Sequence, residues 1–136
     1  MVNMKIQEIE GIGPAYGAKL AEAGVANTDQ LLETGKTRKG RKTLATSTEL
    51  SEKLILKWVN MADLFRLDGV GPEYAELLEA AGVDTVKELQ YRNAENLAAA
   101  MAQVNEQKQL TRRVPTSTAI SGWVAEAKEL PPMVEY

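Results

Sequence analysis

Two glycine turns carry the residues of this chain that are best suited to chemistry, and that chemistry is anion binding by backbone amides. Each turn places Gly, an aliphatic residue and Gly directly before Pro, at Gly11 to Pro14 and, 58 residues later, at Gly69 to Pro72. Proline is favoured at the first position of a helix. The first N–H groups of a helix have no partner inside it, and the helix dipole adds partial positive charge there. Each predicted helix start is therefore able to bind a phosphate.

The rest of the composition excludes most catalytic centres. The chain has no cysteine and no histidine, so disulfides, thiolate nucleophiles, histidine-based triads and zinc sites built from these residues cannot form. Gly35-Lys36-Thr37 resembles the end of a P-loop, but the earlier glycine at the required spacing and the preceding strand are missing. We expect a protein that is not an enzyme and that needs no metal or cofactor.

Positive charge is concentrated in the first half. Residues 1–62 hold nine basic and seven acidic side chains, whereas residues 63–136 hold seven and twelve. Five cations fall within eight residues, at Lys36, Arg38, Lys39, Arg41 and Lys42. Such a run favours a phosphate-binding surface if the fold brings it beside the first turn. A solvated helix end and a surface for an acidic protein partner are the alternatives.

The elements that must position these residues follow from an internal duplication. A shift of 58 residues pairs Leu20 with Leu78, Gly24 with Gly82 and Leu31 with Leu89. Trp58 then matches Trp123 if the second copy carries a seven-residue insertion between Leu89 and Thr116. We expect two tandem units, residues 1–64, which are basic, and residues 65–136, which are acidic, longer and end in a tail after Pro131-Pro132.

Local signals predict an all-α fold of roughly nine to eleven short helices, because no alternating β-branched pattern is sustained. Asn27 and Thr85, each followed three residues later by Gln or Glu, are typical of helix N-caps, as is Ser51. Residues 46–49 are predicted to be a polar loop, an Ala-rich helix spans about 96–109, and a last helix spans about 116–130. Trp58 and Trp123 are predicted to be core anchors, with the two tyrosines that follow the glycine turns, Tyr16 and Tyr74, packed under those turns.

The residues at 9–20 and 67–78 resemble helix-hairpin-helix elements. Each unit is similar to the small single-hairpin domains at the N-terminus of strand-exchange recombinases and at the C-terminus of the bacterial RNA polymerase alpha subunit. The whole chain also resembles a prokaryotic tandem-hairpin family of unknown function, through residues 82–89, Arg113 to Pro115 and the Trp123 helix. These resemblances imply helical repeats and, for the hairpins, binding to DNA without reading its sequence.

Related DNA-binding hairpins place Lys or Arg just after the second glycine, where this chain has Ala15 and Glu73. We therefore expect the second hairpin, Gly69, Val70 and Gly71, to be structural or to bind only weakly. The residues expected to contact nucleic acid belong to the first unit and are Gly11, Ile12, Gly13, Ala15, Lys19, Lys36, Arg38, Lys39, Arg41 and Lys42. A protein-interaction or scaffold module that binds no nucleic acid is the alternative function.

Location and assembly are less constrained. No apolar run approaches the roughly 18 residues that a membrane span requires, and the first ten residues lack the basic and apolar regions of a signal peptide. A cytoplasmic protein is the expectation. The sequence leaves the oligomeric state open.

Overall fold

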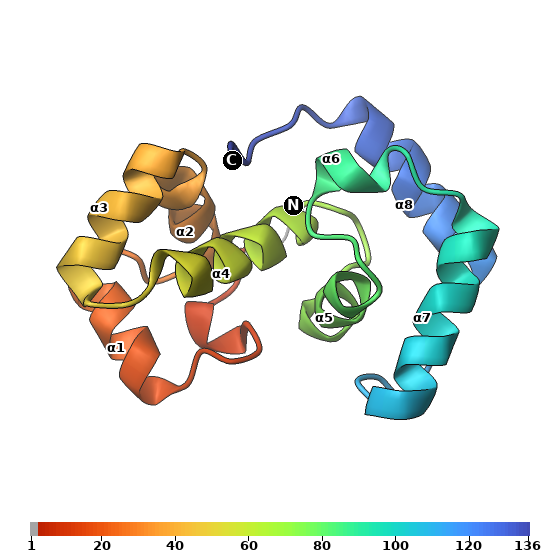
Figure 1. The fold of residues 1–136 in the computed structure, drawn as a ribbon, viewed down its shortest axis with the longest axis horizontal. Helices are drawn as coiled ribbons and strands as arrows, with labels where there is room; N and C mark the ends of the chain where they lie inside the picture. Colours follow the sequence, from red (N-terminus) through yellow and green to blue (C-terminus); the bar gives the residue numbers. More distant parts are fainter. Residues whose placement is uncertain (1–2) are drawn as a thin grey trace.

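The computed structural model describes residues 3–136, and within them the chain is all-helical, as predicted (Figure 1). Eight α-helices and one short 3-10 helix, with no strand, make up the described part, so the count lies at the lower end of the expected range. Met1 and Val2, which the first predicted unit includes, lie outside the described residues. No helix in the described range has both the length and the apolar character needed to cross a membrane.

The elements follow one another with short connections. The first half contains η1 (Ile6–Glu8), α1 (Pro14–Glu22), α2 (Thr28–Gly35), α3 (Arg38–Thr48) and α4 (Glu52–Leu64). The second half contains α5 (Pro72–Ala80), α6 (Val86–Leu89), α7 (Ala94–Lys108) and α8 (Ser117–Glu129). The α7 helix is longer than α3, and the loop between α7 and α8 is longer than the loop between α3 and α4. Both differences fall between Leu89 and Thr116, where the insertion was expected.

The predicted N-caps are confirmed. The side-chain oxygen of Asn27 accepts a hydrogen bond from the Gln30 amide at 2.8 Å, that of Ser51 from the Leu54 amide at 3.1 Å, and that of Thr85 from the Glu88 amide at 3.4 Å. These side chains satisfy first-turn amides that the helix itself leaves unpaired. Among the α-helices of residues 3–136, those that begin without a side-chain cap are α1 and α5, where glycine stands at the N-cap position.

One predicted loop is wrong. Residues 46–48 continue α3, and the helix ends only at Glu49, whose φ of 61° is left-handed. The reason is Thr48, which is buried and donates its hydroxyl hydrogen to the Leu44 carbonyl at 2.7 Å. A polar residue that satisfies its own hydroxyl on the helix backbone can face the core, which its polarity alone does not indicate.

The core runs through both halves. Trp58 and Trp123 are both buried, as predicted, within one cluster of apolar side chains that extends from Ile6 to Ala127. The α4 helix lies at the centre of the molecule, where it packs against α2, α3 and α5, while α8 packs against α6 and α7 (Figure 1). Both halves therefore share the packing of one central helix.

A buried ion pair joins the connection after α4 to the second half. Arg66 donates from Nη1 to Asp63 Oδ1 at 2.8 Å, and both side chains are almost completely buried. Asp63 Oδ2 also accepts the Val86 amide at 2.9 Å, and Arg66 Nη2 donates to the Pro131 carbonyl at 2.6 Å. The pair therefore connects the start of α6 and the segment just after α8 to the end of α4.

The C-terminal tail returns to the first half. Figure 1 shows it leaving α8 and crossing to the edge formed by α2 and α3. There the Glu135 amide donates to the Lys36 carbonyl at 2.7 Å, and the Arg41 guanidinium donates to the Glu135 carbonyl. The tail therefore connects the two ends of the molecule.

Candidate nucleic-acid interface

The two glycine turns have nearly the same backbone geometry. The first glycine of each has a positive φ, 94° at Gly11 and 84° at Gly69, which L side chains rarely adopt. The aliphatic residue then turns its amide inward, so that Ile12 donates to the Ile9 carbonyl at 3.1 Å and Val70 to the Leu67 carbonyl at 3.2 Å. Because their side chains are buried as well, Ile12 and Val70 shape the turns and do not offer a contact to a ligand.

Unpaired amides follow each turn. In the described part of the chain, the N–H groups of Gly13, Ala15 and Tyr16 have no hydrogen-bond partner, since the first bond of α1 runs from Gly17 to the Gly13 carbonyl at 2.9 Å. Pro14 has no N–H to offer, and all three residues with free amides are exposed. These amides lie at the positive end of the α1 dipole, an arrangement that favours a nearby anion.

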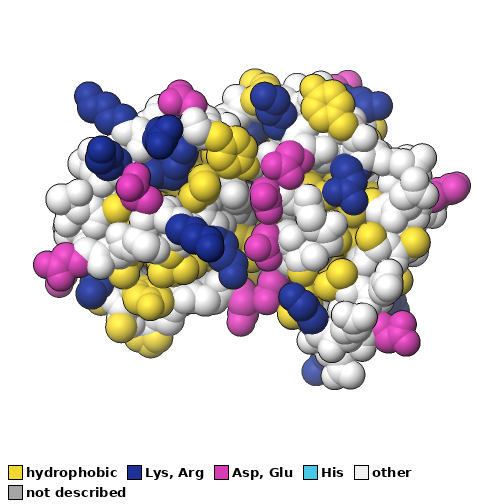
Figure 2. Space-filling model, viewed as in Figure 1, with side chains coloured by type: hydrophobic (Ala, Val, Ile, Leu, Met, Phe, Trp, Pro, Cys, Tyr) yellow, Lys and Arg dark blue, Asp and Glu magenta, His cyan; other side chains and the backbone are white. Residues whose placement is uncertain are grey.

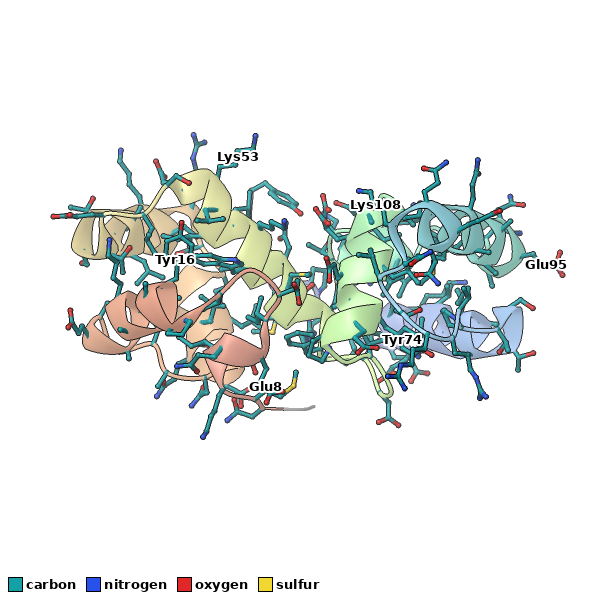
Figure 3. The ribbon with its side chains drawn as sticks, turned by 90° about the horizontal axis from the view of Figure 1, so that it is seen from below. Glu8, Tyr16, Lys53, Tyr74, Glu95 and Lys108 are labelled. Atoms are coloured by element: carbon teal, nitrogen blue, oxygen red, sulfur yellow. The ribbon has the colours of Figure 1, made fainter. Side chains whose placement is uncertain are left out.

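A tyrosine and a tryptophan support each turn from below. The Tyr16 and Trp58 rings lie 5.4 Å apart at 53°, and the Tyr74 and Trp123 rings lie 5.6 Å apart at the same angle. In Figure 3 the two labelled tyrosines lie in separate halves of the molecule. The indole nitrogen of each tryptophan is 3.7 Å from where a Cβ would stand on Gly11 or Gly69. Each tyrosine therefore packs against the tryptophan that lies beside the first glycine of its turn.

Carboxylates surround the second turn. A cleft of about 460 Å³ beside it is lined by Glu10, Gly69, Gly71, Pro72, Glu73 and Tyr74. Glu73 stands two residues after Gly71, in the first turn of α5. Glu10, which directly precedes the first turn, also lines this cleft, so the two turns are neighbours. Negative side chains beside the free amides oppose the binding of a phosphate.

Arg41 does not belong to the predicted basic surface, and that prediction is wrong. Its side chain is buried, with 4% exposed, and its guanidinium donates to the Gly35 carbonyl at 2.8 Å, to the Lys36 carbonyl at 3.2 Å and to the Glu135 carbonyl. The guanidinium closes the end of α2 and anchors the tail. Arginine can make several such bonds at once because it presents five donors in a fixed plane.

The other cations of the run differ in their exposure and in whether they form an ion pair. Lys36 is half-buried and forms an ion pair with Glu33 at 3.0 Å. Arg38, Lys39 and Lys42 are exposed, and none forms an ion pair within the range that the structure describes. Figure 2 shows basic side chains gathered near the start of α3. Three cations therefore remain accessible there.

The fold does not bring these cations beside the first turn. Lys19, Glu22 and Ala23 at the end of α1 lie beside Ser47, Thr48 and Glu49 at the end of α3, around a shared cleft. The glycine turn lies at the other end of α1 and the cations at the other end of α3. Figure 1 shows the two at opposite edges of the first half. They form two separate surfaces and cannot hold the same phosphate.

The family model described as Domain of unknown function (DUF4332) matches residues 10–130. The chain belongs to the family DUF4332. The match spans both glycine turns and the Trp123 helix, so the predicted membership in a family of unknown function is confirmed. No curated protein and no solved structure matches the chain. DUF4332 carries no established activity that would transfer to these residues.

Sequence reasoning did not find two further polar features of this DUF4332 chain. These are the Asp63–Arg66 pair and Asn60, whose side-chain oxygen is buried without a partner. Their sequence signal is weak, since each lies within or just beyond an otherwise apolar helix face and its burial depends on distant segments. Within residues 3–136 no group of carboxylates is arranged to hold a metal ion.

Proposed function

We propose that this protein is a non-enzymatic module that binds the sugar-phosphate backbone of DNA at its first hairpin, without reading the bases. The observation that carries the proposal is the set of three unpartnered amides on the exposed residues Gly13, Ala15 and Tyr16. They lie at a helix N-terminus in the basic half of the chain. Backbone amides and a helix dipole attract phosphate regardless of base sequence.

A second, independent contact comes from Arg38, Lys39 and Lys42. Because they lie at the opposite edge of the first half, they contact a phosphate farther along the nucleic acid than the one at the hairpin. Lys19 lies between these two surfaces, at the end of α1. Neutralising several phosphates releases counterions, so binding weakens steeply as salt increases.

The second hairpin provides an internal control because its turn has nearly the same backbone geometry, with Gly71 and Tyr74 less exposed than Gly13 and Tyr16. An acidic residue precedes both turns, Glu10 in one and Asp68 in the other, but Glu73 in the first turn of α5 is negative where α1 has Ala15. We assign it a structural role.

The test is fluorescence anisotropy of a labelled duplex and a labelled single strand over a salt series, with a matched pair of variants. Gly13→Asp places a carboxylate at the N-cap of α1. There it accepts hydrogen bonds from the free amides in place of a ligand, and its charge repels phosphate. Gly71→Asp makes the same change in the second hairpin. A Cβ meets no atom within 4 Å at either position, and φ is negative at both. Aspartate is a preferred N-cap, so both variants should fold at least as stably as the wild type.

Gly13→Asp is expected to weaken duplex binding by roughly tenfold or more, which corresponds to about 1.4 kcal/mol, while Gly71→Asp leaves it nearly unchanged. Equal losses in both variants, or no binding by the wild type at low salt, would contradict the proposal. Changing Arg38, Lys39 and Lys42 together to Glu should lower the salt slope, and Arg41 is left in place because it is structural.

A protein-interaction module remains the second candidate, and Tyr91 is the observation that favours it. This aromatic side chain is 79% exposed on the connection between α6 and α7, in the acidic half. Tyrosine is enriched at protein interfaces. Sedimentation of the wild type and of Tyr91→Ser would show whether this side chain supports self-association.

A further inference from the structure

The tail, residues 131–136, is held on the first half by few contacts. The Glu135 amide donates to the Lys36 carbonyl at 2.7 Å, and the Glu135 carbonyl accepts from the Arg41 guanidinium. Four of the six tail residues are exposed, and the other two are half-buried. Extended segments with so little buried surface open at a low cost in free energy. The end of the tail can therefore leave the first half without unfolding it.

The Arg41 guanidinium uses its two terminal nitrogens differently. Nη1 donates to the carbonyls of Gly35 and Lys36, at 2.8 Å and 3.2 Å, and so closes the end of α2. Among the described residues, Nη2 donates only to the Glu135 carbonyl. When the tail leaves, Nη1 keeps its role in α2, whereas Nη2 loses its acceptor. A charged donor without an acceptor favours an anion that takes the empty position.

The tail also brings negative charge to this place. Burial lowers the pKa of Arg41, the charge of Glu135 raises it, and that of Arg38 lowers it. Both side chains are therefore close enough to act on the guanidinium. Glu52, at the start of α4, has a weaker effect. Figure 2 shows basic side chains gathered near the start of α3, so the Glu135 carboxylate lies beside the accessible cations of this surface. Departure of the tail leaves positive charge in excess there.

We propose that Arg41 Nη2, together with Arg38, forms a further phosphate site for the DNA backbone, and that the docked tail masks it. The Glu135 carbonyl occupies the position of a phosphate oxygen, and the Glu135 carboxylate repels phosphate. This inference rests on the proposed function and adds regulation to it. The tail and DNA compete for one donor, so the affinity for DNA is lowered by the fraction of molecules in which the tail is docked.

Two full-length variants separate the charge of Glu135 from the docking of the tail. Glu135→Gln removes the carboxylate and keeps both backbone contacts, so duplex affinity should rise by roughly two- to threefold. Glu135→Pro removes the amide hydrogen that bonds the Lys36 carbonyl and so releases the tail. Duplex binding should then be about tenfold tighter at low salt, through one charge-assisted hydrogen bond. The salt slope should steepen by about 0.9, because one more phosphate is neutralised.

The control is Glu129→Gln, which neutralises an exposed carboxylate at the end of α8 and should bind like the wild type. Amide spectra check that α1 to α4 keep their fold in Glu135→Pro. Unchanged duplex affinity and salt slope in that folded variant would overturn the masked site. If Glu135→Pro does not fold, Glu135→Gln decides: an affinity equal to that of the wild type would overturn the proposal.

Inorganic phosphate distinguishes this site from the first hairpin. In Glu135→Pro, millimolar phosphate should shift the amides of residues 36–42, and these shifts should be far smaller in the wild type. Such shifts in a protein that binds no duplex would support the masked phosphate site and contradict the hairpin proposal. Duplex binding by the wild type, without the phosphate shifts in Glu135→Pro, would leave the hairpin proposal standing and overturn the masked site.

Discussion

The first glycine turn, Gly11 to Pro14, and the second, Gly69 to Pro72, share a backbone but differ in what surrounds it. Their first glycines have φ values of 94° and 84°, and their tyrosine and tryptophan rings meet at the same 53° angle. Yet Ala15 follows one turn and Glu73 the other. The comparison teaches that the geometry needed to present free amides is maintained by buried residues, whereas the charge that decides whether phosphate binds depends on exposed ones.

The buried Asp63–Arg66 pair after α4 is the largest difference between the two halves of the chain, and removing it should have the largest effect. Asp63→Ala leaves the buried Arg66 without its counter-ion and the Val86 amide without its acceptor. We expect the free energy of unfolding to fall by about 3–5 kcal/mol, measured by urea denaturation. The matching position in the second unit is Lys128, which is exposed, and Lys128→Ala should change stability by less than about 0.5 kcal/mol. Similar losses of stability in the two variants would show that the buried Asp63–Arg66 pair contributes no more than an exposed side chain does.

The shared backbone can be tested by substituting the first glycine of each turn. Gly11→Ala and Gly69→Ala both place a Cβ on a residue with positive φ, but neither meets an atom closer than 3.7 Å. Each should lower the free energy of unfolding by about 1–2 kcal/mol through backbone strain alone, and the two values should agree within about 0.5 kcal/mol.

Gly122→Ala, inside α8 and with open space around it, is the control and should stabilise the protein by up to about 1 kcal/mol. Unequal costs at Gly11 and Gly69 would mean that the two turns are not held equivalently.

The smallest expected effect concerns Asp84, whose counterpart 58 residues earlier is the uncharged Ala26. Burial raises the pKa of Asp84 in the folded state, so its ionised form opposes folding at neutral pH. Asp84→Asn should therefore melt at a higher temperature than the wild type at pH 7. This gain should shrink as the pH falls through the raised pKa and vanish below the unfolded value near 3.8. A gain that does not change between pH 7 and pH 3 would assign the effect to another cause.

Sequence patterns predicted the parts of the fold that depend on neighbouring residues. The Gly-Pro helix starts, the caps at Asn27 and Thr85 and the buried Trp58 each follow from side chains within a few positions. Local hydrogen bonds and helical periodicity determine such features, so a single sequence contains enough information.

The patterns failed where a charged or polar side chain is paired across a long stretch of chain. The run of cations at residues 36–42 predicts a surface position for Arg41, but its guanidinium is buried and donates to the Glu135 carbonyl, 94 residues away. Arg66 likewise meets Pro131 across 65 residues. The separation of the first turn from the α3 cations depends on how two helices cross, and side-chain spacing does not encode that.

The contact between Arg41 and Glu135 also sets an order of events during synthesis. At about 5–20 residues per second, residue 135 is made roughly 5–20 s after residue 41. Once residue 64 has been made, α1 to α4 are available to pack, but the Arg41 guanidinium still lacks one of its acceptors. The first half therefore completes its own hydrogen bonding only after translation has passed through the second half.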